Sequence, residues 1–283
     1  MGFEDDKKID ALDLFSPEVR KRIEEATRYP PLPDWPAEVR GIPNICLRSS
    51  LFGVVQRGRR RAVKGELLAS IKGISIRYTG WRLDQGDFDV LLYALHLVSL
   101  EKSTKDHARF FGKGFLRAIG RTSGKSGREW LKDSFRRLTG SAVEITFEIK
   151  DHFNESSYTY AGSLVDEFYY SSDEGCYLLK INPKLAKLFD AGWTQMQWQQ
   201  RRLLKTDLAK WLHGFYASHR APYPIKVSTL KLLCGSSYGR LSDFRGKLRR
   251  ALHELANINM LESWEIDEKD KVHVIKRTAK PPV

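Results

Sequence analysis

The chain has 283 residues, of which 41% are hydrophobic and 29% charged, so it can form one large globular domain or two of ordinary size. Lys and Arg number 48 against 35 Asp and Glu, a net charge of +13, which favours a polyanionic partner: nucleic acid first, an acidic membrane second. The cysteines, Cys46, Cys176 and Cys234, are too far apart for a disulfide framework or a paired-cysteine zinc module.

The sequence contains no recognisable secretory or membrane-spanning segment. The N-terminus is acidic, and Asp6 stands where a myristoylation signal needs Ser or Thr. The most apolar run, residues 91–100, contains His96 and is about half as long as the roughly 20 residues that cross a bilayer. No long amphipathic helix pairs Lys or Arg with an exposed apolar face, so nucleic acid is favoured over a membrane surface. We expect a soluble protein of a reducing, cytoplasmic compartment.

Residues 1–43 are predicted to form a flexible N-terminal arm. Ser16 and Pro17 are typical of a helix start, and this helix should end near Thr27 or Arg28. The proline-rich residues 30–36 cannot continue it and predict an extended spacer. The basic residues 57–61, beyond the arm, form either a solvated loop or a phosphate contact.

The rest of the chain follows one plan twice, with the first copy beginning near Asp87. Apolar residues spaced three and four apart over residues 88–98 predict an amphipathic helix. Residues 103–111 are predicted to be a shorter helix with a capping-box start, and a second capping box at Ser126 opens a helix that ends near Gly140. Strands are predicted to follow, at residues 142–149, 158–168 and 176–181.

The second copy follows a Trp- and Gln-rich segment at residues 193–200. Its predicted helices cover residues 204–215, a short segment from Ser228 to Leu233, and a longer one from Ser242 or Asp243 to Asn257. A hairpin at residues 264–275 with a polar turn completes it.

This repeated order predicts an α+β chain of two tandem winged helix-turn-helix domains behind the flexible arm. The expected boundaries are residues 1–43 for the arm, 44–192 for the first domain and 193–283 for the second.

The third helix of each copy combines an apolar side with a basic side that can enter the major groove. The apolar residues are Leu131, Phe135 and Leu138 in the first copy, and Phe244, Leu248, Leu252 and Leu255 in the second. A solvated surface helix is the alternative, but it usually interleaves Glu with its basic residues, and these faces are nearly free of acids. The predicted DNA-binding residues are Lys125, Arg128, Lys132 and Arg136 in the first copy, and Arg240, Arg245, Lys247, Arg249, Arg250 and His253 in the second.

The sequence lacks the enzyme motifs that its glycines, histidines and tyrosines could suggest. Residues 120–126 place three residues between two glycines where a phosphate-binding loop needs four, and His253-Glu254 is followed by Asn257 rather than a second histidine. No His-x-His pair accompanies Tyr169 and Tyr170, and no His-x-x-Arg occurs. We therefore expect a protein that is not an enzyme and has no catalytic residue, metal or cofactor.

Three segments resemble a known family: Gly-Trp-Arg-Leu-Asp-Gln-Gly-Asp-Phe-Asp-Val at 80–90, Gly-Arg-Glu-Trp-Leu at 127–131 and Leu-Thr-Gly-Ser-Ala-Val-Glu at 138–144. They are similar to TrfA-type plasmid replication initiators, from about Asn44 to Lys276. The resemblance implies two winged-helix domains that bind directly repeated sites, called iterons, in double-stranded origin DNA of a bacterial plasmid. It also implies melting of adjacent A·T-rich DNA, recruitment of the host replicative helicase, plasmid copy control and a monomer–homodimer equilibrium.

Residues 11–15, Ala-Leu-Asp-Leu-Phe, resemble the family's sliding-clamp peptide Gln-Leu-x-Leu-Phe, with Ala in the place of Gln. The resemblance implies that Leu12, Asp13, Leu14 and Phe15 bind the clamp, more weakly because the polar first residue is missing. The other interpretation is a hydrophobic lead-in to the Ser16 helix.

Two other functions stay open: a winged-helix transcriptional repressor without a role in replication, and an RNA-binding or scaffold protein. A functional clamp peptide would count against the repressor, and tandem repeats in the bound DNA would exclude the scaffold. The buried strands of the first copy are the expected dimer surface.

Overall fold

The computed structural model describes residues 16–19, 31–56, 58, 60–101, 107–151 and 154–277, and it divides the chain into two compact units, Met1–Pro30 and Pro31–Val283. In the first unit, residues 17–19 are helical, and the Ser16 hydroxyl accepts a hydrogen bond from the Val19 N–H at 3.4 Å. Ser16 is thus placed as the predicted cap. The rest of the predicted helix, to Thr27 or Arg28, lies outside the described residues.

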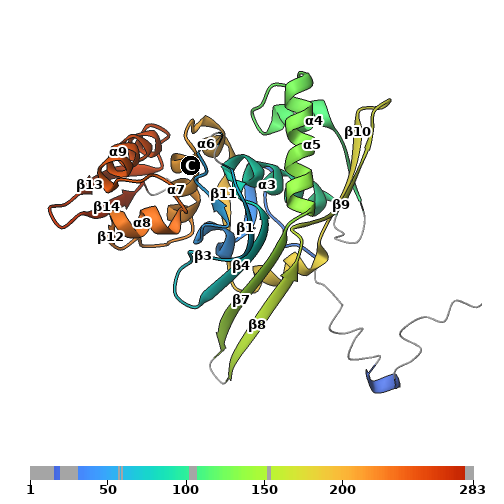
Figure 1. The fold of residues 1–283 in the computed structure, drawn as a ribbon, viewed down its shortest axis with the longest axis horizontal. Coiled ribbons are helices and arrows are strands. Elements are labelled where there is room, and N and C mark those ends of the chain that lie inside the picture. The colour runs from blue at the N-terminus through green and yellow to red at the C-terminus, as the bar shows by residue number, and fades with distance from the viewer. Residues whose placement is uncertain are drawn as a thin grey trace, which may run out of the picture. The chain divides into compact units, whose positions relative to one another are not determined.

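The first winged-helix module follows the order helix, strand, helix, helix, hairpin (Figure 1). Strand β6 pairs with β10, which pairs with β9, so the sheet order is β6-β10-β9. Leu131, Phe135 and Leu138 of α5 are fully buried, as predicted, and the Phe135 ring meets Phe115 of α4 and Tyr177 of β10. The elements are α3 (Gln85–Leu100), β6 (Ala108–Phe111), α4 (Gly112–Ala118), α5 (Lys125–Thr139), β9 (Val165–Ser171) and β10 (Cys176–Ile181).

The second winged-helix module repeats this order with a sheet of the same topology, β12-β14-β13. Phe244, Leu248, Leu252 and Leu255 of its third helix are fully buried, again as predicted. The elements are α7 (Asp207–Ala217), β12 (Ile225–Lys226), α8 (Val227–Leu233), α9 (Leu241–Asn257), β13 (Leu261–Ile266) and β14 (Lys271–Lys276).

A four-stranded antiparallel sheet is added to the first module alone. Its order is β3-β4-β7-β8, and the long β7–β8 hairpin is inserted between α5 and the wing strand β9 (Figure 1). The predicted strand at residues 142–149 therefore belongs to this sheet rather than to the wing. The bounds are β3 (Ala62–Leu68), β4 (Ile74–Trp81), β7 (Ala142–Asp151) and β8 (Asn154–Gly162).

Short elements join the modules. Strand β1 (Val39–Pro43) is buried and pairs with β11 (Trp193–Gln197), so residues 39–43, assigned to the arm from the sequence, belong to the compact unit. Strand β2 (Phe52–Gly53) pairs in parallel with β5 (Leu83–Asp84). The remaining elements are α2 (Asn44–Leu47), the 3₁₀ helix η2 (Pro183–Phe189) and α6 (Trp198–Leu203).

Buried charges fix the contact between the modules. The Arg201 side chain is fully buried, and its Nε donates to Asp89 Oδ1 of α3 at 2.6 Å. Lys210 of α7 pairs with the other oxygen of Asp89, and Arg201 also donates to the Gln85 side chain at 3.0 Å. Trp211 of α7 donates through Nε1 to the Ser49 carbonyl at 3.0 Å. The two modules therefore pack as parts of one compact unit.

Several sequence-based boundaries are wrong. Residues 108–111 form strand β6 instead of a helix, because Phe110 stacks on Tyr177 of β10 with centroids 5.3 Å apart; residues 103–106 of that predicted helix lie outside the described part of the chain. Helix α4, which begins with the poor helix formers Gly112 and Gly114, was not predicted, and burial of Phe115 and Leu116 holds it in place.

The predicted helix starts in the second module are shifted by one to three residues. Leu204 is the C-cap of α6, which ends at Leu203, and α7 begins at Asp207 with Thr206 as its side-chain cap. Helix α8 begins at Val227, one residue before the predicted cap Ser228. The predicted strand at residues 158–168 is two strands, β8 and β9, separated at residues 163–164. Among the described residues, no helix is long and apolar enough to span a membrane.

Candidate nucleic-acid interface

Helix α5 carries four predicted DNA-binding residues, two of which are already paired. Lys125 and Arg128 are exposed and have no ion pair within the described part of the chain. Lys132 lies 3.2 Å from Glu129 and over the Tyr170 ring of β9, 4.2 Å from its centroid. The expectation that this face is nearly free of acids is therefore wrong for α5.

Arg136 is the second paired cation of α5. Its guanidinium donates to Asp133 at 2.7 Å, and both side chains are more than half exposed. An exposed pair of this kind contributes about 0–1 kcal/mol, so a phosphate can compete for the guanidinium. Arg136 can therefore still contact DNA, at the cost of breaking this pair.

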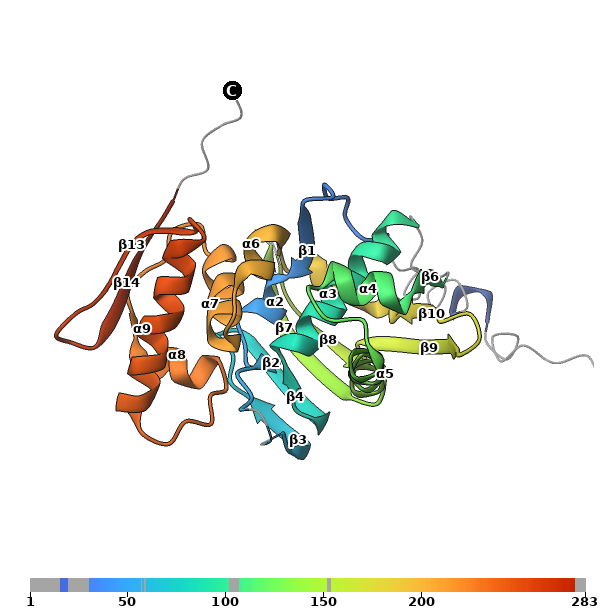
Figure 2. The same cartoon turned by 90° about the horizontal axis from the view of Figure 1, so that it is seen from above.

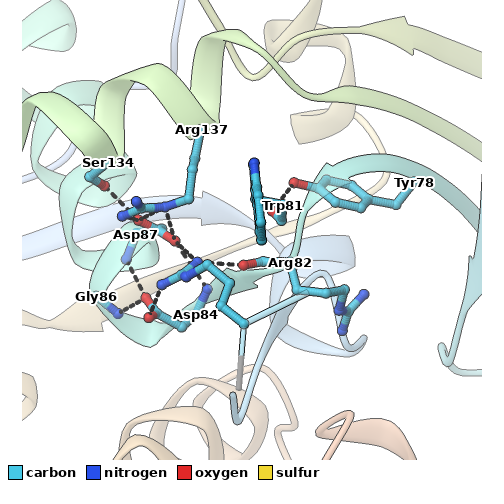
Figure 3. Close-up of polar contacts among 9 residues, drawn as sticks. Tyr78, Trp81, Arg82, Asp84, Gly86, Asp87, Ser134 and Arg137 are labelled. Atoms are coloured by element: carbon cyan, nitrogen blue, oxygen red, sulfur yellow. Dashed lines mark hydrogen bonds and ion pairs between the residues drawn. The ribbon is translucent and has the colours of Figure 1, made fainter. Parts of the chain in front are cut away.

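A buried carboxylate fixes how α5 lies on α3 (Figure 3). Asp87, which is fully buried, accepts hydrogen bonds from Arg137 and Ser134 of α5, both at 2.7 Å, and forms an ion pair with Arg60 at 2.7 Å. Burial alone would raise the pKa of Asp87, but the hydrogen bond and charge of Arg137 and the charge of Arg60 outweigh it and hold the pKa below its usual value. Asp84 caps α3 by accepting from the Gly86 and Asp87 N–H groups, both at 2.9 Å.

This network assigns a structural role to Arg60, one member of the basic cluster at residues 57–61. Arg60 pairs with Asp84 as well as Asp87, and Arg61 pairs with Glu66 at 2.8 Å. The sequence left two alternatives for this cluster, a solvated loop or a phosphate contact. Arg60 fits neither, because it is paired with two carboxylates. Arg57 and Arg59 lie outside the described residues.

Helix α9 presents a larger set of free cations than α5. Four exposed residues have no acidic partner within the part of the chain that the structure describes: Arg240, Lys247, Arg249 and Arg250. Arg245 instead pairs with Asp270 of the wing turn at 2.9 Å. The His253 ring meets Trp264 of β13 edge-on, with centroids 4.8 Å apart. Of the cations predicted to bind DNA at α9, only Arg245 therefore has an acidic partner within the described residues.

The third helices of the two modules, α5 and α9, which are the predicted recognition helices, also lack side-chain caps. Gly124 and Arg240 are their N-cap residues, and neither provides a capping hydrogen bond. The predicted capping box at Ser126 is accordingly wrong, because Ser126 is already inside α5. In contrast, Asp84 and Thr206 cap α3 and α7. The uncapped N–H groups of the first turn, together with the helix dipole, suit a phosphate group.

The wings do not add to this positive surface. The β9–β10 turn of the first module exposes Asp173 and Glu174. In the second module, Asp267 of the turn pairs with His273 at 2.9 Å. The candidate DNA-binding cations therefore lie on the helices. Helix α4 adds exposed Lys113 and Arg117, one turn apart; the sequence reasoning missed both because it did not predict this helix.

The axes of the recognition helices are steeply inclined to each other. In Figure 2, α5 is seen end-on whereas α9 lies lengthwise across the view.

The predicted clamp-binding residues Leu12, Asp13, Leu14 and Phe15 lie outside the described part of the chain. Among the residues that are described, no three His, Cys, Asp or Glu side chains gather as a metal site would require.

Comparisons with known proteins connect this arrangement to replication initiators. Residues 29–277 match the model of the family described as TrfA protein. The plasmid replication initiator protein TrfA of Escherichia coli is 26% identical over an alignment of 245 residues, and the match covers 84% of this chain and 62% of that protein. Two crystal structures of RctB domains 2 and 3 are similar at 14% identity, with TM-scores of 0.53 and 0.51; they cover 80% and 79% of this chain, and 95% of each RctB chain is covered. This likeness supports the fold of two winged-helix modules.

Proposed function

This chain belongs to the TrfA family, and on that premise we propose that it initiates plasmid replication by binding repeated sites at the plasmid origin. The observation that carries the proposal is the set of four exposed cations without an acidic partner at α9, the third helix of a winged helix-turn-helix module: Arg240 at its N-cap, and Lys247, Arg249 and Arg250 within it. A second recognition helix, α5, belongs to the same compact unit. The name of the E. coli relative, a plasmid replication initiator, supports the same function.

Each repeat would be bound by both modules in neighbouring major grooves. Residues of α9 and α5 would divide between phosphate contacts, which fix the position on the duplex, and base contacts, which give specificity. Arg128 and Arg249 are the strongest candidates for base contacts, because both are exposed, unpaired and lie on the predicted reading faces.

The inclination of α5 to α9 suggests how binding could promote strand opening (Figure 2). In a straight duplex, successive turns of the major groove run in the same direction. Two recognition helices whose axes are steeply inclined to each other therefore fit neighbouring turns of the groove best when the DNA bends between them. Bending a site of this size costs a few kcal/mol by elastic estimates, which the contacts of both helices would supply. An adjacent A·T-rich region would then melt at a lower additional cost.

The protein would act without catalysis, by recruiting the host's replication machinery. We propose the replicative helicase as one partner and the sliding clamp as another, the latter through Leu12, Asp13, Leu14 and Phe15. A monomer–homodimer equilibrium would regulate initiation, with the monomer as the initiating form.

The first test is binding of the full chain to DNA that carries direct repeats of roughly 17–22 base pairs, about two helical turns. We expect the repeats to be bound at least a hundredfold more tightly than a scrambled duplex at fixed salt. Equal affinity for both would overturn the proposal. Tight binding to the repeats, with no replication of a plasmid that carries them and the gene, would identify a repressor instead.

The second test addresses the clamp. A pull-down with purified sliding clamp compares the native chain with Phe15→Ala, which removes an apolar anchor, and with the nearby Asp6→Ala as a control. We expect Phe15→Ala to lose most of the recovered clamp and Asp6→Ala to retain it. Equal recovery by all three chains would contradict a clamp-binding role for residues 11–15.

A further inference from the structure

A cavity of about 320 Å³ lies where the two modules meet, between β3 and the turn that joins α8 to α9. Three cations line it: Arg61 and Arg82 from the first module and Lys231 from the second. Arg61 is neutralised by Glu66, which also lines the cavity, at 2.8 Å. The cavity therefore holds two positive charges, Arg82 and Lys231, in excess of its carboxylate.

Arg82 is the unusual member of this set, because it is buried and forms no ion pair among the described residues, and Glu66, the acid that acts on it, is paired with Arg61. Only 6% of the residue is exposed. Its Nη2 donates to the Ser50 carbonyl at 2.7 Å, but its Nη1 has no hydrogen-bond partner among the described residues. Figure 3 shows the side chain directed away from the Asp84–Asp87 cluster that neutralises Arg60 and Arg137. Burial lowers the pKa of Arg82 below its ordinary value, although the charge of Glu66 acts in the opposite direction.

The other buried arginines of the described chain have a partner that Arg82 lacks. Arg201 pairs with Asp89 at 2.6 Å. Arg40 lies over the Trp198 ring, 5.0 Å from its centroid, and over the Tyr93 ring. A buried guanidinium with neither an ion-paired carboxylate nor a ring in contact is costly, and a bound anion offsets that cost.

Two glycines keep the space around Arg82 open. A Cβ atom added to Gly53 or to Gly235 would lie 3.1 Å from Arg82 Nη2, and the one on Gly235 would also lie 2.8 Å from Ser50 Cβ. Gly235 has a φ of +61° and ends α8 in a Schellman motif, in which the Ser236 N–H donates to the Lys231 carbonyl at 3.2 Å. The turn beside the cavity is thus held by its own backbone, with room left for the guanidinium.

From this geometry we propose that the cavity binds a phosphate group, with Arg82 and Lys231 as its charged donors. A guanidinium presents a fork of N–H groups that matches two phosphate oxygens, and Lys supplies a second charge. The group belongs either to the DNA backbone, held beside the turn before α9, or to a small phosphate compound in solution. The DNA source rests on the proposed function, whereas the free-phosphate source does not.

The test uses the full chain and three substitutions. Arg82→Met and Lys231→Gln each remove one charge from the cavity, and Lys187→Gln removes one from an exposed position on η2 as the matched control. Circular dichroism and thermal unfolding establish that each variant folds; Lys231, at the module surface, carries the test if Arg82→Met unfolds. The probes are inorganic phosphate and pyrophosphate in calorimetry at constant ionic strength, and the repeat duplex over a range of salt concentrations.

If the source is a free compound, the native chain binds phosphate or pyrophosphate, Arg82→Met and Lys231→Gln weaken this binding at least tenfold, and Lys187→Gln does not. If the source is DNA, the free anions do not bind, and both cavity variants reduce the slope of log K against log salt by about 1 relative to Lys187→Gln. In either case the double variant loses less binding free energy than the two single variants lose together, because both residues hold the same phosphate group.

The proposal is overturned if the native chain binds neither free anion and the cavity variants match Lys187→Gln in their DNA salt dependence. Failure of the proposed function is a separate result, in which the native chain does not prefer the repeats over scrambled DNA. In that case binding of the free anions alone decides the inference.

Discussion

The two winged-helix modules share one order of elements and one sheet topology, yet their recognition helices differ in charge. Acidic residues one turn away pair with two of the four predicted cations of α5. On α9, the only such pair among the described residues reaches to the wing, from Arg245 to Asp270. A common fold therefore does not impose a common electrostatic role, and we expect the second module to provide more of the phosphate contacts.

Two buried carboxylates of α3 also differ in what they hold together. The first module is held together internally by Asp87, which joins α3 to α5, whereas Asp89, two residues later, joins α3 to the second module through Arg201 and Lys210. Neighbouring carboxylates on one helix thus serve different purposes, one within a module and one between modules. This difference leads to the largest effect that we predict.

Replacing Asp89 with Ala should reduce the free energy of unfolding by about 3–5 kcal/mol, because it leaves the fully buried Arg201 without its counter-charge. Urea unfolding followed by circular dichroism measures the loss. We expect the transition to broaden or split as the modules uncouple, whereas the exposed control Asp190→Ala should behave as the native chain does. A loss below 1 kcal/mol would show that the charged contact does not hold the modules together.

Acid should destabilise the second module through His213. Burial lowers the pKa of His213 to about 3, so only the unfolded chain takes up a proton at this site between pH 6.5 and 3. The contribution of His213 to the free energy of unfolding is therefore fully present above pH 6.5 and decreases as the pH is lowered, by about 2 kcal/mol at pH 5. Asp207 acts in the opposite sense: burial raises its pKa to about 6, so protonation between pH 6 and 4 favours the folded state.

The variant His213→Gln isolates this contribution, since Asp207 is present in both chains. We expect the difference in unfolding free energy between the native chain and His213→Gln to shrink by about 2 kcal/mol when the pH falls from 7 to 5. A difference that stays constant over this range would exclude His213 as the source. His96 of the first module, with a pKa lowered to about 4 by burial and by the Arg40 charge, adds a similar loss to both chains.

On the DNA side, Arg249→Ala should weaken binding to the repeats by about 1–3 kcal/mol if Arg249 contacts a guanine. Fluorescence anisotropy at two salt concentrations separates this effect from a phosphate contact, which would instead lower the salt slope. Lys187→Gln provides the control. Unchanged affinity together with unchanged salt dependence would remove α9 as a reading helix.

The smallest predicted effect is on the salt dependence of DNA binding, and it tests the difference in charge between α9 and α5 directly. Lys247→Ala should reduce the salt slope by about 1, whereas Lys132→Ala should reduce it by less, because Lys132 is already paired with Glu129 and covers the Tyr170 ring. Binding measured from low to moderate salt gives both slopes. Equal reductions would mean that the pairs on α5 open completely when DNA binds.

Local sequence patterns predicted the helices that matter most. The apolar spacing of Leu131, Phe135 and Leu138, and of the corresponding residues in α9, identified both recognition helices and their buried faces. The pairs of Lys132 with Glu129 and of Arg136 with Asp133 were also readable, at a spacing of three residues, but were overlooked. The clamp peptide stays a prediction.

The errors depend on contacts between residues far apart in the chain. Strand β6 exists because Phe110 stacks on Tyr177. The β7–β8 hairpin joins a sheet with β3 and β4, which precede helices α4 and α5 in the chain. Arg60 was expected at the surface, but Asp84 and Asp87, more than 20 residues later, bind it. No local pattern specifies such partners.

Hydroxyl-radical footprinting of the full chain on a duplex with a single repeat tests the central claim most directly, namely that α5 and α9 bind neighbouring major grooves of one site. We predict two protected patches about one helical turn apart on the same face of the duplex. Arg128→Ala should weaken one patch and Arg249→Ala the other. A single patch that responds to only one of these substitutions, or protection on opposite faces of the duplex, would contradict the account.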